Sequence, residues 1–238
     1  MAEPYFQFKK FRVYHHRNAF KVGTDGVLLG AWAEVNNGEH ALDIGTGSGL
    51  IALMVAQRST ITMDAIDLNP LAAQLASTNF QHSPFSDIRA YHCDLKEYRP
   101  EQQNVYDLIV CNPPFFSHAQ PPKDNTLNLA KHTVGLSPAE LFREVKRLLK
   151  PTGRFSLIFP MQEKELFLDQ AHVNGFHPLR EMLIHPVPNQ PAIRLMVTFT
   201  YQRDQAPQQE VLILENEAGK RGYTEAYRKL TEAYFLRF

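Results

Sequence analysis

Short apolar runs alternate with longer segments of helical periodicity over residues 41–201, a pattern typical of βαβ units that build a parallel sheet with helices on both faces. The predicted strands are Ala41–Ile44, Thr62–Asp67, Ile88–Cys93, Asp107–Cys111, Arg154–Phe159, Leu179–Ile184 and Ile193–Tyr201. The predicted helices are Leu50–Gln57, Pro70–Phe80, Pro138–Leu149 and Gln162–Asn174. We therefore expect an α/β fold on a mostly parallel, seven-stranded sheet.

The last two of these strands are the expected exception to the parallel order. Only the proline-rich segment His185–Ala192 separates them, which is too short for a crossover helix. They should therefore form an antiparallel pair at one edge of the sheet. Two further elements follow, a strand at Val211–Leu214 and a final helix from Thr224 to about Leu236.

The helix predicted at Pro138–Leu149 has the clearest boundaries. Ser137 and Glu140 have the spacing of a capping box, and Pro138 stands at the first helical position, where its missing N–H costs nothing. Pro151 and Gly153 should stop the helix, because proline cannot continue it and glycine commonly follows a helix end.

A glycine-rich turn joins the first predicted strand to the first predicted helix. Leu42-Asp43-Ile44 runs directly into Gly45-Thr46-Gly47-Ser48-Gly49. Glycines let the backbone turn tightly and approach a ligand, and the free N–H groups of the following helix point to that place. A dinucleotide fingerprint needs its third glycine at residue 50, which is leucine. The spacing favours a ligand without pyrophosphate, such as S-adenosylmethionine, whose amino and carboxylate groups would face Asp43 and the turn.

Three acidic residues stand at the ends of three successive predicted strands, namely Asp43, Asp67 and Asp94. A carboxylate at Asp67 can accept hydrogen bonds from both ribose hydroxyls, and Asp94 is placed to meet the adenine amino group. Each has a structural alternative. Asp67 could cap the next helix, and Asp94 could be a plain turn aspartate.

The strand Asp107–Cys111 leads into Asn112-Pro113-Pro114-Phe115. Ligands of open α/β sheets bind at the carboxyl ends of the strands, so this tetrapeptide should lie beside the cofactor. Asn112 Oδ1 and the Pro113 carbonyl can each accept one hydrogen of a planar amino group, which turns the nitrogen lone pair toward a methyl donor. Pro113 and Pro114 stiffen the backbone, and Phe115 offers a face for a base to stack on. The structural alternative is a proline-rich turn with an asparagine cap.

The glycine turn and the Asn112–Phe115 segment together resemble class I methyltransferases, which have a Rossmann-like fold, use S-adenosylmethionine and modify amino groups. The segments Lys21–Trp32 and Tyr223–Tyr227 are similar to the bacterial family that methylates N6 of adenosine 37 in valine tRNA. This resemblance implies that Lys21, Thr24 and Asp25 fold over the cofactor end of the pocket. It also implies that Asn112–Phe115 hold the target adenine and that the anticodon stem-loop is the substrate.

One segment departs from the family pattern. Lys131-His132-Thr133 stands where that family has Arg-His-Glu, and lysine lacks the bidentate fork of arginine, so the contribution of this loop to RNA binding stays open. Within the resemblance, we expect a single methyltransferase domain over residues 1–238. It would comprise a covering segment (1–40), a catalytic α/β core (41–201) and a strand and helix extension (210–238).

Charge is distributed unevenly, although 25 basic and 25 acidic side chains balance overall. Residues 1–21 carry five basic side chains against one acidic, a balance of +4, and residues 219–238 carry five against two, a balance of +3. Basic ends beside an acidic middle are compatible with a local surface that binds a polyanion, and they exclude a uniformly basic protein surface. At the N-terminus aromatic and basic residues interleave, which fits RNA contacts or a half-buried edge strand equally well. These residues are Phe6, Phe8, Lys9, Lys10, Phe11, Arg12 and Tyr14.

Several classes of protein are disfavoured. No apolar run reaches the roughly 18 residues of a membrane-spanning helix, and the N-terminus lacks a secretory signal. Cys93 and Cys111 cannot build a disulfide framework, so we expect buried small residues and a cytoplasmic protein. His15-His16 lacks accompanying metal ligands, so no metal is expected.

The oligomeric state stays open, with a monomer favoured. The alternatives are another acceptor (guanine in rRNA, adenine in DNA or glutamine in a protein) and a non-catalytic module that binds RNA and cofactor.

Overall fold

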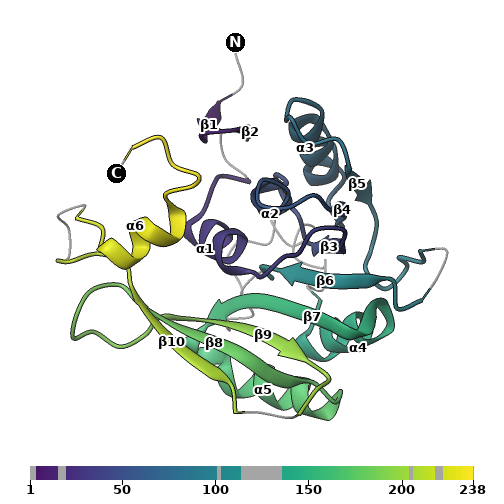
Figure 1. Ribbon diagram of the computed structural model, residues 1–238. Helices are drawn as coiled ribbons and strands as arrows, with labels where there is room; N and C mark the ends of the chain where they lie inside the picture. The colour runs from purple at the N-terminus through teal and green to yellow at the C-terminus, as the bar shows by residue number, and fades with distance from the viewer. Residues whose placement is uncertain are drawn as a thin grey trace, which may run out of the picture.

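The computed structural model describes residues 4–15, 20–100, 103–113, 136–203, 206–217 and 222–237. Its centre is an eight-stranded sheet in the order β10-β8-β9-β7-β6-β3-β4-β5 (Figure 1). The strands are β3 (His40–Ile44), β4 (Thr62–Asp67), β5 (Ile88–His92), β6 (Tyr106–Cys111), β7 (Leu149–Pro160), β8 (His177–His185), β9 (Arg194–Thr200) and β10 (Gln208–Ile213). The strands from β5 to β7 are all parallel, as the pattern predicts.

Helices cover both faces of this sheet (Figure 1). One face packs against α1 (Thr24–Trp32), α2 (Leu50–Ala56), α3 (Pro70–Gln81) and α6 (Glu225–Thr231). The other face packs against α4 (Pro138–Leu148) and α5 (Lys164–Val173). Each face of the sheet has its own hydrophobic core. Neighbouring residues of one strand, for example Ala41 and Leu42, belong to different cores, because side chains alternate across a strand. This two-faced burial explains the continuous apolar runs in the sequence.

The capping box predicted for α4 is confirmed. Ser137 Oγ accepts a hydrogen bond from the Glu140 amide (3.3 Å), and Glu140 Oε2 accepts one from the Ser137 amide (2.9 Å). The expected start of the next strand at Arg154 is wrong, since β7 begins at Leu149 and includes Pro151 and Gly153. A register shift in the β6–β7 pairing leaves this stretch outside the regular ladder, where a proline is tolerated.

The antiparallel hairpin is confirmed, but it does not end the sheet. β9 runs antiparallel to both β7 and β8, and β10 then adds to β8 in parallel, from Gln208 opposite Arg180 to Ile213 opposite His185. The expectation of seven strands with the hairpin at the edge is therefore wrong.

Side-chain contacts join β8, β10 and α1. The Arg180 guanidinium of β8 lies 4.5 Å from the ring centroid of Trp32 and pairs with Glu210 of β10, with Nε 2.6 Å from Oε1. The Trp32 indole N–H donates to the other carboxylate oxygen of Glu210 (3.4 Å). These three residues are far apart in the sequence, so no local pattern predicts their contact.

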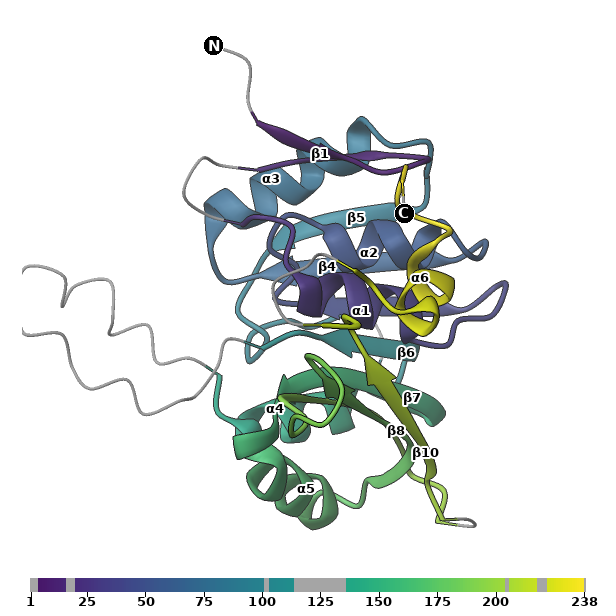
Figure 2. The same ribbon diagram turned by 90° about the vertical axis from the view of Figure 1, so that its left-hand side faces the viewer.

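The two ends of the chain pack together (Figure 2). β1 (Tyr5–Gln7) and β2 (Arg12–Tyr14) form a separate antiparallel hairpin, and the Lys9 amide in its turn donates to the Tyr234 carbonyl (2.8 Å). Phe8 is buried and stacks on Phe235, with ring centroids 5.8 Å apart. Phe8 is thus fully buried in the turn after β1, whereas Phe6, within β1, is 38% exposed. The final helix is shorter than expected and ends at Thr231.

Helix α1 is not among the predicted helices, and it contains two glycines, which lower helix propensity. Both glycines lie against α2. A Cβ at Gly30 would come 2.9 Å from Met54 Cβ, and one at Gly26 would come 3.1 Å from Leu50 Cδ2. They let α1 approach α2 closely, and α2 begins at the end of the glycine turn. Among the described residues, every helix is too short or too polar to cross a membrane.

Candidate active site

The glycine turn is fixed to the neighbouring strand. The amides of Gly45 and Thr46 donate to the Ile66 carbonyl (2.9 and 3.0 Å). Gly45 and Gly47 have φ of +70° and +58°, a left-handed region that side chains disfavour. A Cβ at Gly45 would meet no protein atom within 4 Å, because open space lies beside it. The turn therefore exposes backbone to a ligand.

That open space is a cavity of about 380 Å³ at the carboxyl ends of β3, β4, β5 and β6. Its volume suits a small-molecule cofactor, since such sites measure about 300–1,000 Å³. The predicted site residues that line it are Gly45, Gly47, Asp67, Asp94, Asn112 and Pro113. A more open hollow of about 600 Å³ lies between α3 and the edge strand β5, but none of the predicted site residues lines it.

Asp43 lies fully buried behind the glycine turn. One carboxylate oxygen, Oδ2, accepts a hydrogen bond from the Thr46 hydroxyl (2.7 Å), and the other, Oδ1, has no hydrogen-bond partner among the described residues. Burial raises the pKa of Asp43 to about 7, and the nearby Asp67 carboxylate adds to this rise, whereas interactions with the Thr46 hydroxyl and the Ala52 backbone amide oppose it. A buried acceptor without a donor is costly unless a ligand supplies one.

Asp67 stabilises the turn from the end of β4. Its two oxygens accept hydrogen bonds from the amides of Gly47 (2.9 Å) and Asn69 (2.8 Å). The alternative that Asp67 caps the next helix is wrong, because the Asn69 side chain caps α3 by accepting from the Leu71 amide. Each Asp67 oxygen has a second lone pair, so the carboxylate keeps acceptor capacity on the cavity side.

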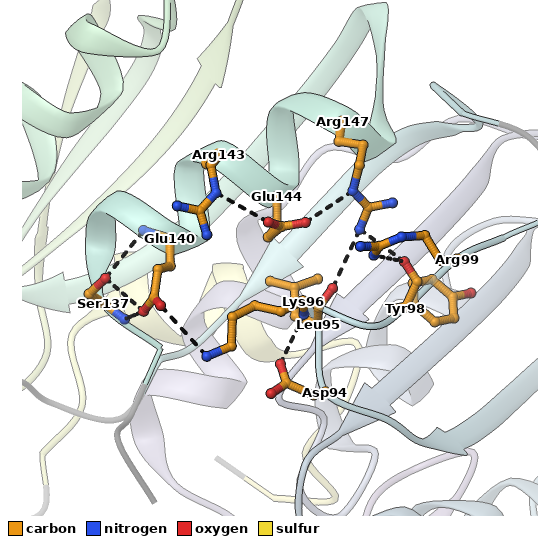
Figure 3. A network of polar contacts seen from close by, with 10 residues as sticks. All are labelled: Asp94, Leu95, Lys96, Tyr98, Arg99, Ser137, Glu140, Arg143, Glu144 and Arg147. Carbon is orange, nitrogen blue, oxygen red and sulfur yellow. Dashed lines mark hydrogen bonds and ion pairs between the residues drawn. The ribbon is translucent and has the colours of Figure 1, made fainter.

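Asp94 begins a turn and also lines the cavity (Figure 3). Its Oδ1 accepts from the Lys96 amide (2.9 Å), and its carbonyl accepts from the amides of Glu97 and Tyr98 (2.9 Å each). The alternative that Asp94 is a turn aspartate is therefore confirmed. This role is compatible with a ligand contact, because the same residue lines the cavity.

Asn112 and Pro113 lie directly after β6 and line the cavity on the side away from Asp94's strand. Pro113 is buried and Asn112 is partly buried. The strand end thus brings a side-chain amide and a carbonyl to the same space as the glycine turn. Pro114, Phe115 and the Lys131-His132-Thr133 segment lie outside the described residues.

Several predicted site residues do not line the cavity, among them Asp43 and Thr46, which are buried behind it. Lys21 and Thr24 are exposed near the start of α1, and Asp25 forms an ion pair with Arg194 (2.9 Å). Gly49 has φ of +80° and packs inside the protein, where a Cβ would overlap the ring of Phe80. Gly49 thus serves the contact between α2 and α3.

Other residues line the cavity without a signal in the sequence pattern. Phe20 has a φ of +55° and lies beside Gly47, and Leu136 approaches from the start of α4. Cys93 and Cys111 also line it; Cys111 is buried as expected, but Cys93 is only partly buried. Burial raises the thiol pKa of Cys111 well above its ordinary value, and the carboxylates of Asp43 and Asp67 add to this, so the thiol stays protonated. No cluster of three metal-ligating side chains occurs among the described residues.

An open α/β sheet with a glycine turn after β3, acids at the ends of β4 and β5 and an Asn-Pro segment after β6 defines a methyltransferase of class I. The chain belongs to the methyltransferase small domain family, whose model matches residues 11–168. It is 43% identical over 238 residues to the tRNA1(Val) (adenine(37)-N6)-methyltransferase of Parabacteroides distasonis, with all of both chains covered. It is 37% identical to the protein of the same name from Pseudoalteromonas translucida, with 98% of both chains covered.

Solved structures confirm the fold. A predicted O-methyltransferase from Agrobacterium tumefaciens matches with a TM-score of 0.68 at 19% identity, and the match covers 88% of this chain and 96% of that one. A ribosomal protein L11 methylase from Lactobacillus delbrueckii matches with a TM-score of 0.55 at 15% identity, over 76% of this chain and 80% of that one. At this identity the likeness concerns the fold.

Proposed function

We propose that this protein methylates N6 of an adenosine in tRNA, at position 37 of the anticodon loop of valine tRNA, with S-adenosylmethionine as cofactor. The observation that carries the proposal is that the glycine turn and Asn112–Pro113 line one cavity, so a cofactor on the turn and an amino group at Asn112 would be neighbours. The full-length relatives named for this activity support it.

The cofactor fits the residues around the cavity. Asp43 lies behind the glycine turn and outside the cavity lining, so its buried carboxylate would attract the ammonium group of a methionine moiety through its charge. Asp67 has acceptor capacity for the ribose hydroxyls, and Asp94 for the adenine amino group. Bound S-adenosylmethionine supplies a methyl group on a positively charged sulfur, an electrophile that needs no metal ion. The proposal therefore includes no metal.

Asn112 and Pro113 would hold the acceptor. The Asn112 side-chain oxygen and the Pro113 carbonyl each accept one hydrogen of the adenine amino group, which leaves its nitrogen lone pair directed out of the ring plane. Holding this nitrogen in line with the methyl group can lower the barrier by up to about 7–11 kcal/mol. The base must leave its stack to reach the cavity, and an unpaired anticodon-loop base does so at the least cost.

The basic ends of the chain would contact the RNA backbone. The packing of the β1–β2 hairpin on the C-terminal residues places two basic segments on adjoining parts of the surface (Figure 2). Lys10, Arg12, Arg228 and Lys229 are exposed there. Lysine and arginine contacts to phosphates position RNA without reading its sequence. We propose that the protein acts as a monomer in the cytoplasm and that the cavity selects the base.

The test is incubation of the purified protein with isotope-labelled S-adenosylmethionine and total tRNA that lacks the modification, followed by mass spectrometry of the nucleosides. N6-methyladenosine at position 37 of valine tRNA is expected. Asn112→Ala should lower kcat at least about 100-fold with cofactor affinity within about threefold, because it removes an acceptor aligned in the transition state. Asn112→Asp, which keeps an oxygen at this place, should retain part of the activity. Another methylated nucleoside, or full activity of Asn112→Ala, would contradict the proposal.

A further inference from the structure

The residues Asp94–Arg99, here called the Asp94 loop, lie beside helix α4 (Figure 3), and the first part of the loop forms one wall of the cavity. Asp94, Leu95 and Lys96 line the cavity directly. The loop is an irregular turn after β5, so the ladder of the sheet does not fix it beyond His92. Its own hydrogen bonds close the turn, and side chains from other elements attach it to the rest of the protein.

Arg147, in the last turn of α4, supplies the main contact. One terminal nitrogen of its guanidinium, Nη2, donates to the carbonyl of Tyr98 (2.9 Å) and to that of Leu95 (3.4 Å). These two carbonyls lie at either end of the turn that Asp94 begins. Nη2 therefore bonds both carbonyls while Nε of the same planar group bonds Glu144, an arrangement of two nitrogens that a single lysine ammonium cannot reproduce.

Arg147 is itself held in place. Its Nε donates to Glu144 Oε2 (3.0 Å), and Glu144 is buried at 8% exposure. The other oxygen of Glu144 accepts from Arg143 (3.3 Å), whose side chain is 60% exposed and, among the described residues, forms a hydrogen bond or ion pair with Glu144 and none with the loop (Figure 3). Two arginines thus share one carboxylate, but only Arg147 reaches the Asp94 loop among the described contacts.

Two weaker contacts support the same wall. Lys96 Nζ lies 3.6 Å from Glu140 Oε1 at the start of α4, and hydrogen bonds from Ser137 lower the pKa of Glu140, which keeps it ionised. At the far end of the loop, the hydroxyl of Tyr98 lies 2.6 Å from that of Tyr106, which donates to Asp64 Oδ2 (2.7 Å). The loop is therefore bound to α4 on one side and to the sheet on the other.

We infer that Arg147 is a positioning residue, which holds the Asp94 loop in the shape that receives the adenosyl end of the cofactor. The inference deepens the proposed function and rests on it for the identity of the ligand. Arg147 does not touch the cavity, so its effect must pass through the loop carbonyls. Its loss should raise the dissociation constant for S-adenosylmethionine and leave kcat at saturating cofactor nearly unchanged, because Asn112 and Pro113 lie on another strand.

The test compares Arg147→Met with Arg143→Met. Both substitutions remove one partner of Glu144, and only the first removes the contact with the loop. We expect the Kd for S-adenosylmethionine, measured by calorimetry, to rise about tenfold in Arg147→Met, the order of effect of a lost charged hydrogen bond, and to change less than about twofold in Arg143→Met. Arg147→Lys keeps a charge for Glu144 but loses the fork, so its effect should be intermediate.

Hydrogen exchange of the ligand-free proteins tests the loop without the cofactor. The amides of Lys96, Glu97 and Tyr98 donate within the Asp94 turn, so they should exchange about tenfold faster in Arg147→Met and at the wild-type rate in Arg143→Met. Equal behaviour of the two methionine variants in both assays would overturn the inference. If Arg147→Met does not fold, wild-type values for Arg147→Lys would overturn it. A wild-type protein that binds no S-adenosylmethionine would instead overturn the proposed function, and the exchange rates would still decide whether Arg147 holds the loop.

Discussion

Replacing Asp43 with asparagine should stabilise the ligand-free protein at neutral pH and weaken its binding of S-adenosylmethionine. Both effects follow from the fully buried carboxylate, whose Oδ1 has no hydrogen-bond partner among the described residues. A group of this kind is unfavourable in the folded chain until a positively charged ligand pairs with it. The asparagine is isosteric and uncharged, and its oxygen can still accept the hydroxyl of Thr46.

The magnitude follows from the pKa. Burial raises the pKa of Asp43 from 3.8 to about 7 in the folded protein. Because the folded pKa is the higher one, the carboxyl contributes stability below the unfolded pKa, and this contribution is lost as pH rises through about 7. Between pH 5 and pH 8 the loss is about 3 kcal/mol, at about 1.4 kcal/mol for each pH unit up to the folded pKa. The asparagine variant lacks this pH-dependent contribution to stability. The free-energy cost of its unpaired amide is the same at both pH values.

The assay is guanidinium unfolding of both proteins at pH 5 and pH 8, followed by the fluorescence of Trp32, the single tryptophan, which is buried. The free energy of unfolding of wild type relative to Asp43→Asn should fall by about 3 kcal/mol from pH 5 to pH 8. Calorimetry should show at least about tenfold weaker cofactor binding by the variant, because the negative charge behind the glycine turn is lost. Parallel pH curves would refute the raised pKa, and unchanged affinity would refute the attraction between the Asp43 charge and the cofactor.

Two further substitutions test the packing of the glycine turn and the role of the basic ends. Gly49→Ala should destabilise the protein at least about 1 kcal/mol more than Gly38→Ala in chemical unfolding, because both glycines have φ of +80° but only Gly49 has Phe80 against the added Cβ. Equal losses would show that backbone strain, and not packing, decides both. Lys10→Ala should weaken tRNA binding about two- to threefold at low salt and reduce the slope of log Kd against log salt by about one, with no change in Kd for S-adenosylmethionine. A salt slope equal to that of wild type would exclude Lys10 from the RNA surface.

The sequence could predict the part of the site that parallel strands bring together. Gly45, Asp67, Asp94 and Asn112 lie far apart along the chain, yet each stands at the carboxyl end of a strand or within two residues after it. Because the carboxyl ends of parallel strands lie at one edge of the sheet, knowing the strands was enough to place these residues around one cavity. The capping box at Ser137 was predictable for a similar reason, since its contacts span only three residues.

The sequence could not predict features that depend on contacts between distant segments. Helix α1 contains two glycines that weaken it locally, and it forms because Gly26 and Gly30 allow close packing on α2. β10 is attached through Trp32 and Glu210, residues separated by 178 positions. The role of Gly49 in packing also depends on a ring from another helix, which no glycine spacing reveals.

The sequence by itself thus determined where the strands and turns of the parallel part of the sheet lie along the chain, and which chemical groups stand at the strand ends. Both depend on local periodicity and on residues that follow one another. Only the tertiary structure decided how the walls of the cavity are held: Asp43 buried with one oxygen unpaired, and Arg147 spanning two carbonyls of the Asp94 loop. Burial and long-range hydrogen bonds exist only after the layers have packed, and they set the pKa of Asp43 and the position of the loop.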